Sequence, residues 1–427
     1  MIHTKKENVM KAKAVRMHGK NDLRLDEFDL PKLKDDEILA KIITDSVCMS
    51  TYKEANQGSD HLRVPEDIDE HPVIVGHEFA GKIVKVGEKW KDQYKEGQTI
   101  VINPAINGQI YAPGYSYEFF GGACTYCIIP PEAIEAKSMI PMDTECFYEL
   151  SVTEPIFCIA GGFHSNIHLK PNSHEVVSGT KKDGNMIIFG GCGPMGLGAI
   201  SYAMAIENHP KRLVITEISD ERLERAANFL SPEMAAEKGI ELHYINTAKC
   251  EDERKELMEL TDGEGYDDVF IFTPIKAVAE TANSVLGTDG CMNLFAGPLD
   301  HQFKAEMNLY DSHYKNTKIV GSSGGVRSDF LEALELIKDK KVNPAVMITH
   351  IGGIDVYADT VLNLPKIPGG KKLIYQQFDM PLTAIDDFEK LGESDPLMKE
   401  LADACKAHGG LWNPEAEQIL LKHHGII

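Results

Sequence analysis

The feature that most constrains this 427-residue chain is a glycine motif, GxGxxG, formed by Gly191, Gly193 and Gly196. An apolar run at 186–189 comes directly before it, and a helix-like stretch follows. In a strand–turn–helix unit the first glycine permits a tight turn, the second lets the backbone approach a pyrophosphate, and the third lets helix and strand pack closely. The sequence therefore predicts a dinucleotide site with the pyrophosphate at the helix N-terminus.

An acidic residue, Glu217, follows the motif by about one βαβ half-unit and closes the apolar run 213–216. Its carboxylate is expected at the carboxyl end of the second strand, where it can accept hydrogen bonds from both ribose hydroxyls. NAD(H) is therefore favoured over NADP(H). Pro194 and Met195, at the start of the predicted helix, complete the predicted cofactor-binding residues.

Uncharged residues fill the whole stretch 186–206, which at ~20 residues is long enough for a membrane span. Five glycines and Pro194 divide this stretch, however, so strand, loop and helix is the better interpretation. The N-terminal residues 1–11 lack the apolar segment of a signal peptide, and the nine scattered cysteines, an odd number, are typical of reduced thiols. A cytoplasmic protein without membrane association is expected.

Length and charge narrow the class further. The chain exceeds the ~250 to 300 residues at which a single core stops growing, so two domains are expected. Its net charge of -22 argues against nucleic acid or an anionic membrane as a partner. An anionic substrate would need a local basic cluster to overcome this field.

The periodicity of the chain changes near residue 154. Residues 12–45 alternate apolar and polar side chains, as in Ile38, Ala40 and Ile42, which is typical of strands. Beyond residue 154, candidate strands alternate with helical stretches, which indicates βαβ units and a parallel sheet. These candidate strands are 186–189, 213–216, 241–245, 268–272 and 291–295. The predicted fold class is α/β, with a β-rich domain beside a doubly wound parallel sheet.

Potential metal ligands occur in the β-rich part. Cys48, His77 with the adjacent Glu78, and Glu154 are far apart in sequence, and each lies at a break between predicted elements. Zinc accepts thiolate, imidazole and carboxylate ligands together, and a catalytic zinc keeps a fourth position open for water or substrate. Taken singly, each residue also has an ordinary explanation as a small core residue or a hydrogen-bonded polar side chain.

Four segments carry a family resemblance: VCMST at 47–51, VGHEFAGKIVKVG at 75–87, TEP at 153–155, and the glycine loop. Their order and spacing resemble those of the zinc-dependent medium-chain dehydrogenases, the alcohol dehydrogenase-like superfamily, over nearly the whole chain. Within it, VCMSTYK with its long polar loop, the lack of a cysteine-rich lobe and the extended C-terminus most resemble the L-sorbose-1-phosphate reductase branch.

The resemblance implies a domain organisation and a set of site residues. A GroES-like catalytic domain at 1–158 and 326–427 would be interrupted by a Rossmann NAD-binding domain at 159–325, and the protein would be a homo-oligomer, a dimer or tetramer. The resemblance makes Cys48, His77 and Glu154 zinc ligands, with Glu78 as an alternating ligand or a partner of the ligands, and Ser50 as the hydroxyl that relays the alcohol proton.

Two positions depart from the family pattern. Thr51 stands where the family usually has Asp, and Lys53 stands where it often has His. Lys53 could be a proton exit, a phosphate contact or a solvated surface lysine. Together with His61 and Arg63 in the following loop it could form an anion pocket, because the arginine fork suits phosphate; solvation of all three is the alternative.

A CxxC pair, Cys124 and Cys127, has no partner pair nearby, so the sequence predicts one catalytic zinc and no structural zinc. The two thiols are expected on opposite faces of one strand. The tail beyond residue 375 is expected to form helices capped by Asp395 and Asn413, which pack on the catalytic domain or on a neighbouring subunit.

These expectations converge on a reaction. The preferred one is zinc-dependent hydride transfer between NAD(H) and a ketose phosphate or polyol phosphate, with L-sorbose 1-phosphate as the ketose. An unphosphorylated polyol or secondary-alcohol dehydrogenase is the first alternative, and a non-enzymatic dinucleotide-binding sensor is the second.

Overall fold

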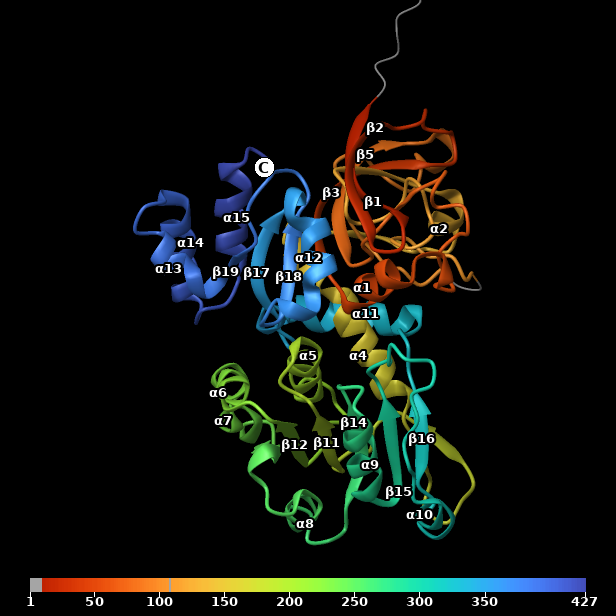
Figure 1. Cartoon of the computed structure of the whole chain (residues 1–427), viewed down its shortest axis with the longest axis vertical. Coiled ribbons are helices and arrows are strands. Elements are labelled where there is room, and N and C mark those ends of the chain that lie inside the picture. The colour runs from red at the N-terminus through yellow and green to blue at the C-terminus, as the bar shows by residue number, and fades with distance from the viewer. Residues whose placement is uncertain (1–9, 107–108) are drawn as a thin grey trace, which may run out of the picture. The chain divides into compact units, whose positions relative to one another are not determined.

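The computed structural model describes residues 10–106 and 109–427 (Figure 1). These residues form two compact units. The first unit takes the described residues up to 154 together with 348–427, and the second unit comprises 155–347. Helix α4 (Thr153–Ser165) runs from one unit into the other.

The first unit is built on an eight-stranded sheet in the order β19-β17-β18-β3-β5-β6-β8, with β7 also paired to β3. Its strands are β3 (Ile38–Val47), β5 (Phe79–Val86), β6 (Thr99–Ile102), β7 (Tyr126–Ile129), β8 (Met139–Met142), β17 (Ile348–Gly353), β18 (Lys371–Tyr375) and β19 (Thr383–Ala384). Neighbouring strands are antiparallel except β17 and β18, which are parallel. A smaller antiparallel sheet joins β1 (Lys11–Gly19), β2 (Asp22–Asp29) and β4 (Val73–Ile74).

The predicted strand alternation around residue 40 is confirmed. Ile38, Ala40 and Ile42 of β3 lie in one buried cluster with Phe79 and Ile83 of β5. Because side chains alternate between the two faces of a strand, these three apolar residues face the same core. The helices of this unit are α1 (Met49–Gln57), α2 (Pro131–Glu135), α3 (Phe147–Ser151), α12 (Tyr357–Asn363), α13 (Phe388–Leu391), α14 (Pro396–Ala407) and α15 (Pro414–His423), with short 3-10 turns η1 (Gly58–Asp60), η2 (Glu88–Trp90), η5 (Ile354–Val356), η6 (Leu364–Lys366) and η7 (Ile385–Asp387).

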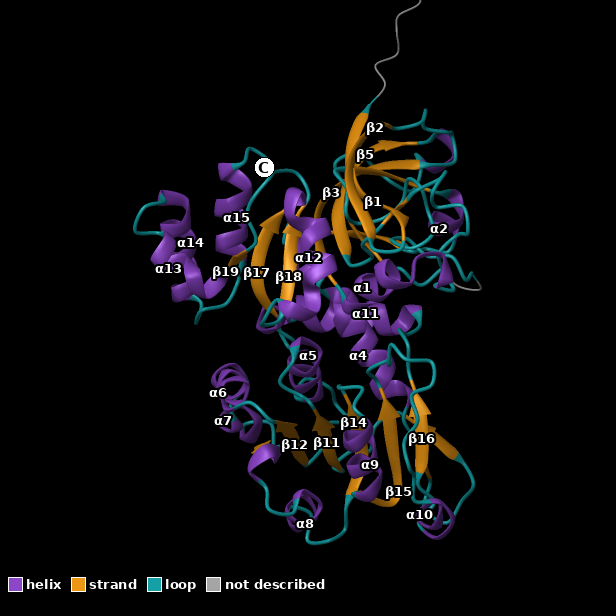
Figure 2. Cartoon of the chain, in the orientation of Figure 1, coloured by secondary structure: helices purple, strands orange, loops and turns teal. Residues whose placement is uncertain are grey.

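The second unit has a six-stranded parallel sheet in the order β13-β12-β11-β14-β15-β16, with helices between successive strands (Figure 2). Its strands are β11 (Asn185–Phe189), β12 (Arg212–Glu217), β13 (Glu241–Asn246), β14 (Tyr266–Ile271), β15 (Leu286–Leu294) and β16 (Lys318–Gly321). This order is that of the doubly wound dinucleotide-binding fold, in which the chain reverses direction across the sheet after its third strand. The predicted α/β fold class is confirmed.

Helices and a hairpin complete the second unit. The helices are α5 (Pro194–Ala203), α6 (Asp220–Phe229), α7 (Pro232–Ala236), α8 (Glu253–Glu259), α9 (Lys276–Ser284), α10 (Leu309–Tyr314) and α11 (Arg327–Lys338), with 3-10 turns η3 (Thr247–Lys249) and η4 (Pro344–Met347). A two-stranded antiparallel hairpin consists of β9 (Ile167–Leu169) and β10 (Val176–Ser178). Every residue of β11 is buried, as expected of a central strand that is covered on both faces.

The second boundary between the units differs from the predicted one. The sequence placed it at 325/326, whereas the chain returns to the first unit only at residue 348. Helix α11 lies between these positions and packs in the second unit: the Phe330 ring lies 5.4 Å from that of Phe157, and His164 is 2.9 Å from the Asp329 carboxylate. Residues 326–347 therefore belong to the second unit, and α11 contacts it through both an apolar and a polar side chain.

The C-terminal tail forms α13, α14 and α15 in the first unit (Figure 1). As predicted, Asp395 caps α14 by accepting hydrogen bonds from the Leu397 and Met398 N–H groups, and Asn413 caps α15. Trp412 is almost fully buried, and its indole N–H donates to the Tyr375 hydroxyl at 3.1 Å. The tail thus packs on the body of its own unit.

The prediction that Cys124 and Cys127 face opposite sides of a strand is wrong. Both belong to the same buried cluster, and their thiols hydrogen-bond to each other. Cys124 lies before β7, where its N–H donates to the Gly122 carbonyl at 2.8 Å, so the two-residue alternation of a strand does not extend to it.

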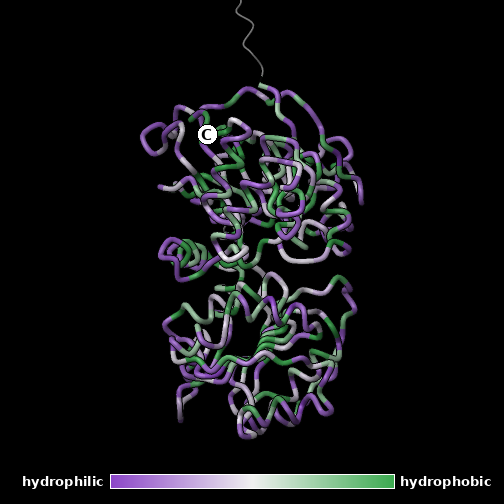
Figure 3. Tube along the Cα trace, turned by 90° about the vertical axis from the view of Figure 1, so that its left-hand side faces the viewer, coloured by the Kyte–Doolittle hydropathy of each residue, from purple (hydrophilic) through white to green (hydrophobic). Residues whose placement is uncertain are grey.

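Hydrophilic and hydrophobic stretches alternate along both units (Figure 3). None of the helices that the structure describes combines the length and the apolar character needed to span a bilayer.

Candidate metal centre

Three side chains able to bind a metal meet beside the main sheet of the first unit. The Cys48 sulfur, a ring nitrogen of His77 and a carboxylate oxygen of Glu78 all lie within 4.8 Å of one another. Cys48 follows the end of β3 and caps α1, while His77 and Glu78 come just before β5. The pairing of β3 with β5 brings them together, and the Ser46 N–H donates to the Glu78 carbonyl at 3.0 Å. Thiol, imidazole and carboxylate are the ligand types that zinc takes, so the donor set fits the metal.

Burial keeps the first two of these groups neutral when no cation is near. Desolvation, with the neighbouring Glu78 and Glu154 charges, raises the pKa of the Cys48 thiol to about 12, although Lys371 lowers it. Desolvation also lowers the pKa of His77 to about 4, and the adjacent Glu78 only partly offsets it. Because a metal binds thiolate and neutral imidazole, its entry would release the Cys48 proton and would find His77 already deprotonated.

Glu78 is held by a buried ion pair. The Lys371 ammonium donates to both carboxylate oxygens of Glu78, and the Ser46 hydroxyl donates to one of them. Both charged side chains are buried, at 4 % exposed for Lys371 and 1 % for Glu78. Burial lowers the pKa of Lys371, but the Glu78 carboxylate more than compensates, so that pKa is raised. The Glu78 carboxylate thus lies close to the other two potential metal ligands, Cys48 and His77, and is already paired with Lys371.

The backbone around Glu78 is fixed as well. Its N–H donates to the Asp45 carboxylate at 2.9 Å, and the Tyr357 hydroxyl donates to the other oxygen of Asp45. Burial raises the pKa of Asp45 to about 8, against these two hydrogen bonds, which lower it. Both Asp45 and Tyr357 are fully buried.

Glu154, the expected third ligand, lies in the first turn of α4 and is 8 % exposed. It is not a member of the group of donors within 4.8 Å. Its negative charge nevertheless raises the pKa values of Cys48 and Lys371, which places it near the centre.

Aromatic and polar side chains surround His77. The Tyr115 ring stacks on the His77 imidazole with centroids 4.9 Å apart, and His61 stacks on Tyr115 at 5.4 Å. The Arg63 guanidinium lies 5.3 Å from the Tyr115 ring. The Thr51 hydroxyl is 3.5 Å from the Nδ1 atom of His77, at the position where the family usually has Asp. The predicted substrate residues His61 and Arg63 are thus near the proposed metal ligands through Tyr115.

The two residues expected in the proton relay lie on α1. Ser50 and Lys53 are both partly buried. Desolvation lowers the pKa of Lys53, and the Cys48 thiolate charge opposes this effect. Lys53 is therefore close enough to Cys48 for the two charges to interact. The interpretation of Lys53 as a solvated surface lysine does not require this proximity.

A buried acid, Glu54, lies one helical turn beyond Thr51 on the same face of α1. Its side chain is fully buried, and neither carboxylate oxygen has a hydrogen-bond partner among the described residues. Desolvation holds its pKa well above the usual value, and the Arg63 charge only partly opposes this.

Sequence reasoning missed Lys371, Ser46 and Tyr115. Lys371 is 293 residues from Glu78 along the chain and reaches it only because β18 pairs with β3. The one local signal was a pair of lysines at the start of an otherwise apolar segment, KKLIY. Tyr115 comes from an irregular loop, where no periodicity indicates what a side chain contacts.

The predicted cofactor-binding glycine motif lies in the second unit. Gly193 caps α5, Pro194 is its first residue and Met195 follows. A Cβ atom on Gly196 would lie 2.2 Å from the Gly191 carbonyl oxygen, so the loop and the helix approach too closely for any side chain there. This is the geometry that leaves backbone N–H groups at a helix N-terminus open to a pyrophosphate.

Glu217 ends β12, the neighbour of β11, and its carboxylate accepts the Ile218 N–H at 2.8 Å. The Arg222 guanidinium is 3.8 Å away. Glu217 is 8 % exposed, and it lies at the carboxyl edge of the sheet where the motif also lies. The predicted cofactor residues of the second unit are thus gathered at one edge.

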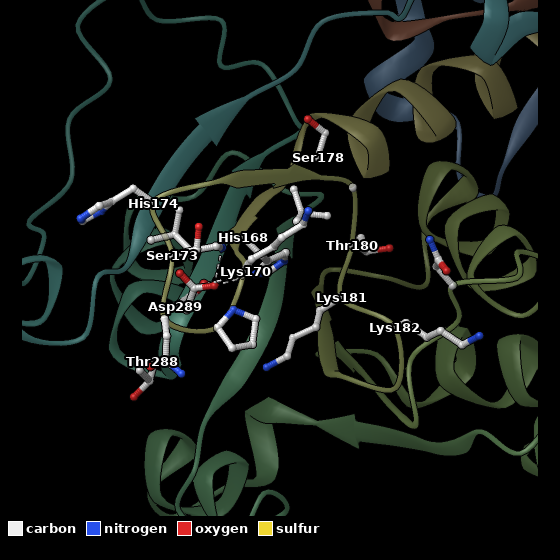
Figure 4. Close-up of a pocket in the computed structure, with 16 residues that line it drawn as sticks. His168, Lys170, Ser173, His174, Ser178, Thr180, Lys181, Lys182, Thr288 and Asp289 are labelled. Carbon is white, nitrogen blue, oxygen red and sulfur yellow. Dashed lines mark hydrogen bonds and ion pairs between the residues drawn. The ribbon is translucent and has the colours of Figure 1, made fainter.

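A cavity of about 1010 Å³ lies elsewhere in the second unit, beside the β9–β10 hairpin (Figure 4). Its cationic side chains are largely paired: Lys170 with Glu175, Lys181 with Asp267, and His168 with Asp268. Since these charges are already compensated, the cavity is a weaker candidate for an anionic ligand than the two sites above.

Comparison with known proteins gives consistent matches. Residues 34–139 match the model of the alcohol dehydrogenase GroES-like domain, and residues 194–339 match that of zinc-binding dehydrogenases. Mannitol-1-phosphate 5-dehydrogenase of Aliivibrio fischeri is 46% identical over 409 residues, 96% of this chain and 97% of that protein. L-sorbose 1-phosphate reductase of Klebsiella pneumoniae is 41% identical over 412 residues, again 96% and 97%.

Among solved structures, 2R,3R-butanediol dehydrogenase of Bacillus subtilis aligns with a TM-score of 0.69 at 24% identity, covering 85% of this chain and 99% of its own. At that identity the likeness establishes a common fold.

Proposed function

The chain belongs to the zinc-dependent, alcohol dehydrogenase-like medium-chain dehydrogenases and is close to their sugar-phosphate oxidoreductases, and from this premise we propose that it interconverts a ketose phosphate and a polyol phosphate with NAD(H). The observation that carries the proposal is the identity above 40% to two such enzymes along nearly the whole chain. The cluster of Cys48, His77 and Glu78 supports it, because the family chemistry needs a bound metal.

In this proposal Cys48 and His77 hold one zinc ion, with a carboxylate from Glu154 or Glu78 as the third ligand. When bound, zinc supplies a Lewis acid that polarises the carbonyl, and the nicotinamide supplies the hydride. Glu78 is already paired with Lys371, and Glu154 is the residue that the family resemblance places as the third ligand. An approach of Glu78 to the metal would require its bonds to Lys371 and Ser46 to lengthen.

In this proposal, side chains of the protein transfer the proton that the product oxygen takes up. In the reducing direction the Ser50 hydroxyl gives a proton to the product oxygen and is reprotonated from the side of Lys53. The lowered pKa of Lys53 favours this role, because a lysine that loses its proton more readily is a better proton donor near neutral pH.

NAD(H) is the proposed coenzyme because Glu217 ends the second strand of the parallel sheet, where a carboxylate pairs with ribose hydroxyls and repels a phosphate. Arg222, 3.8 Å from Glu217, is the nearby cation that would favour NADP(H) if it left this contact. Initial rates with NADH and NADPH test the assignment, and equal kcat/KM for both would contradict it.

For the substrate we propose L-sorbose 1-phosphate, with mannitol 1-phosphate as the second candidate because the 46% identical relative is named for it. The two enzyme names imply different distances between the phosphate and the reacting carbon. In a 1-phosphorylated 2-ketose the phosphate is on the carbon beside the carbonyl, whereas a 5-dehydrogenase acts four carbons from the phosphate of mannitol 1-phosphate. A panel of both compounds, with free sorbose and sorbitol, separates phosphorylated substrates from unphosphorylated polyols. Turnover of free polyols at equal or lower KM would contradict the proposal.

The phosphate is proposed to meet Arg63, with His61 and Lys53 nearby. Arg63 is exposed in the loop after α1 and lies over Tyr115, which itself packs on His77. Substituting R63A is expected to raise KM for the ketose phosphate tenfold or more, about the value of one charge-assisted hydrogen-bond pair, and to leave KM for the free ketose unchanged. R24A, on β2, is the matched control. An equal change for both substrates would remove the phosphate role of Arg63.

A further inference from the structure

The C-terminal extension places a buried carboxylate among hydrogen-bond donors of the main body. Glu417 of α15 is 1 % exposed. Its oxygens accept the backbone N–H groups of Phe147 and Tyr148, both at 2.8 Å, and the Tyr375 hydroxyl at 2.8 Å. None of these donors is charged, so the contact is a directional hydrogen-bond cluster and not an ion pair.

The two backbone donors are the first residues of α3. The first N–H groups of a helix have no partner within the helix and are usually capped by a side chain close in sequence. Here the residue before α3, Cys146, makes no such side-chain bond, and the cap comes from Glu417, 270 residues away from Phe147. The orientation and position of α3 therefore depend on α15.

Helix α3 is directly connected to a proposed metal ligand. Only Val152 separates it from α4, whose second residue is Glu154, and the Thr153 hydroxyl donates to the Glu149 carbonyl at 2.8 Å across this junction. On its other side, the Thr44 hydroxyl of β3 donates to the Phe147 carbonyl at 3.0 Å. A shift at the start of α3 would thus be passed to Glu154.

The third donor belongs to the strand that carries Lys371. Tyr375 ends β18 and is fully buried, and it also accepts the indole N–H of Trp412 from the extension at 3.1 Å. Lys371 begins the same strand and pairs with Glu78. In the sheet, Lys372 is opposite Val47, the neighbour of Cys48.

We propose that Glu417 is a positioning residue of the metal centre: through α3 and β18 it fixes where Glu154 and Lys371 stand relative to Cys48 and His77. The C-terminal extension then has a role in the reaction beyond covering the core. This inference rests on the proposed function for the roles of Glu154 and Lys371.

A carboxylate suits this place better than an amide. All three partners are donors, and a carboxylate offers two acceptor oxygens, whereas glutamine offers one oxygen and an amino group that would face an N–H donor. E417Q keeps the shape of the side chain and replaces one acceptor oxygen by a donor group, which makes it the informative substitution. Y375F keeps both bonds to α3 and removes the bond from Glu417 to β18, together with the acceptor of the Trp412 indole N–H.

The test compares zinc retention and not only turnover. Purified full-length wild type, E417Q and Y375F are titrated with a chromophoric zinc chelator, and their cobalt-substituted forms are compared by the cobalt–thiolate absorption, all well below their unfolding temperatures. Zinc affinity is expected to fall at least tenfold in E417Q, which is the effect usually seen when a metal ligand loses its hydrogen-bond partner. The loss is expected to be smaller in Y375F, and the cobalt spectrum is expected to shift in both variants.

The matched control is D395A, which removes another cap within the same extension. The Asp395 carboxylate accepts the N–H groups of Leu397 and Met398 at the start of α14. D395A is expected to lower the unfolding temperature and to leave zinc affinity and the cobalt spectrum as in wild type. Wild-type zinc affinity in folded E417Q would overturn the inference, as would an equal loss of zinc in D395A.

If E417Q does not fold, Y375F decides by the same two readouts. A wild-type protein that binds no zinc is a different result: it contradicts the proposed function itself, and it is seen before any variant is made.

Discussion

Among single residues, the buried acids of the first unit set the strongest expectations. Glu54 is fully buried, has no hydrogen-bond partner among the described residues, and has a pKa held well above its usual value by desolvation. A carboxyl group with a raised folded-state pKa contributes stability that is complete below its unfolded value and is lost as the pH rises through the folded value.

The first prediction follows from the direction of this pKa shift. As the pH is raised from 5 to 9, the free energy of unfolding of the wild type should fall relative to that of E54Q, because only the wild type must then bury an ionised group or keep binding a proton. Urea denaturation of both proteins at pH 5, 7 and 9 measures this difference. A difference that does not change with pH would show that Glu54 has an ordinary pKa.

The second prediction concerns the ion pair of Lys371 with Glu78. K371M leaves the Glu78 charge buried without its partner, and breaking a buried pair in this way costs about 3–5 kcal/mol of the free energy of unfolding. K11M, which breaks the exposed pair with Glu27, is the control and should change stability little. Denaturation in the presence of a chelator separates this effect from that of the metal. Equal stabilities of K371M and wild type would contradict the buried pairing.

Residue type and position at the breaks between predicted elements made Cys48, His77, Glu78 and Glu154 possible ligands, and the family resemblance supplied their roles. The structure groups the first three, because two strand ends meet where β3 and β5 pair. Lys371 could not be found in this way. Its contact depends on the register of a strand near the other end of the chain, and no local pattern encodes which strand pairs with which.

At the scale of elements, the glycine loop and α5 depend on two glycines for different reasons. A Cβ atom at Gly196 would meet the Gly191 carbonyl at 2.2 Å, whereas one at Gly193 would meet nothing within 4 Å in the protein. Gly196 is therefore required for packing, whereas at Gly193 we expect only the approach of a bound pyrophosphate to exclude a side chain.

This contrast gives the third prediction. G196A should lower both the unfolding temperature of the coenzyme-free protein and its affinity for NADH. G193A should lower NADH affinity and leave the unfolding temperature unchanged. Thermal unfolding and NADH fluorescence titration provide the two readouts. NADH affinity unchanged in both variants would show that coenzyme does not bind at this loop.

Elements differ in how well the sequence predicted them. The central strands β11 and β12 are buried along almost their whole length, so they appear as continuous apolar runs that were predicted almost to their ends. Strand β10 is exposed along its whole length and α3 has five residues, so neither leaves a periodic signal. The α14 and α15 caps were predicted because Asp–Pro and Asn–Pro pairs favour a helix start.

For the whole molecule, composition and motifs lead to the class of enzyme but not to its substrate. The two-domain α/β fold follows from periodicity, and the family follows from four short segments in order. In the proposal above, recognition of the reacting sugar depends on the positions of a few exposed side chains such as Arg63, which neither periodicity nor motif spacing determines. The choice of substrates to be tested comes from the relatives of this chain that are named as sugar-phosphate enzymes.

The fourth prediction tests the central claim, that Cys48 and His77 hold a zinc ion on which hydride transfer depends. The measurement is the zinc content of the purified full-length protein, determined together with its NADH-dependent ketose phosphate reduction before chelation, after chelation and after zinc is restored, with C48S as the matched variant. We expect about one zinc ion per chain, activity that is lost with the metal and regained with it, and neither zinc nor activity in C48S. Full activity in the metal-free protein, or in C48S, would contradict the account.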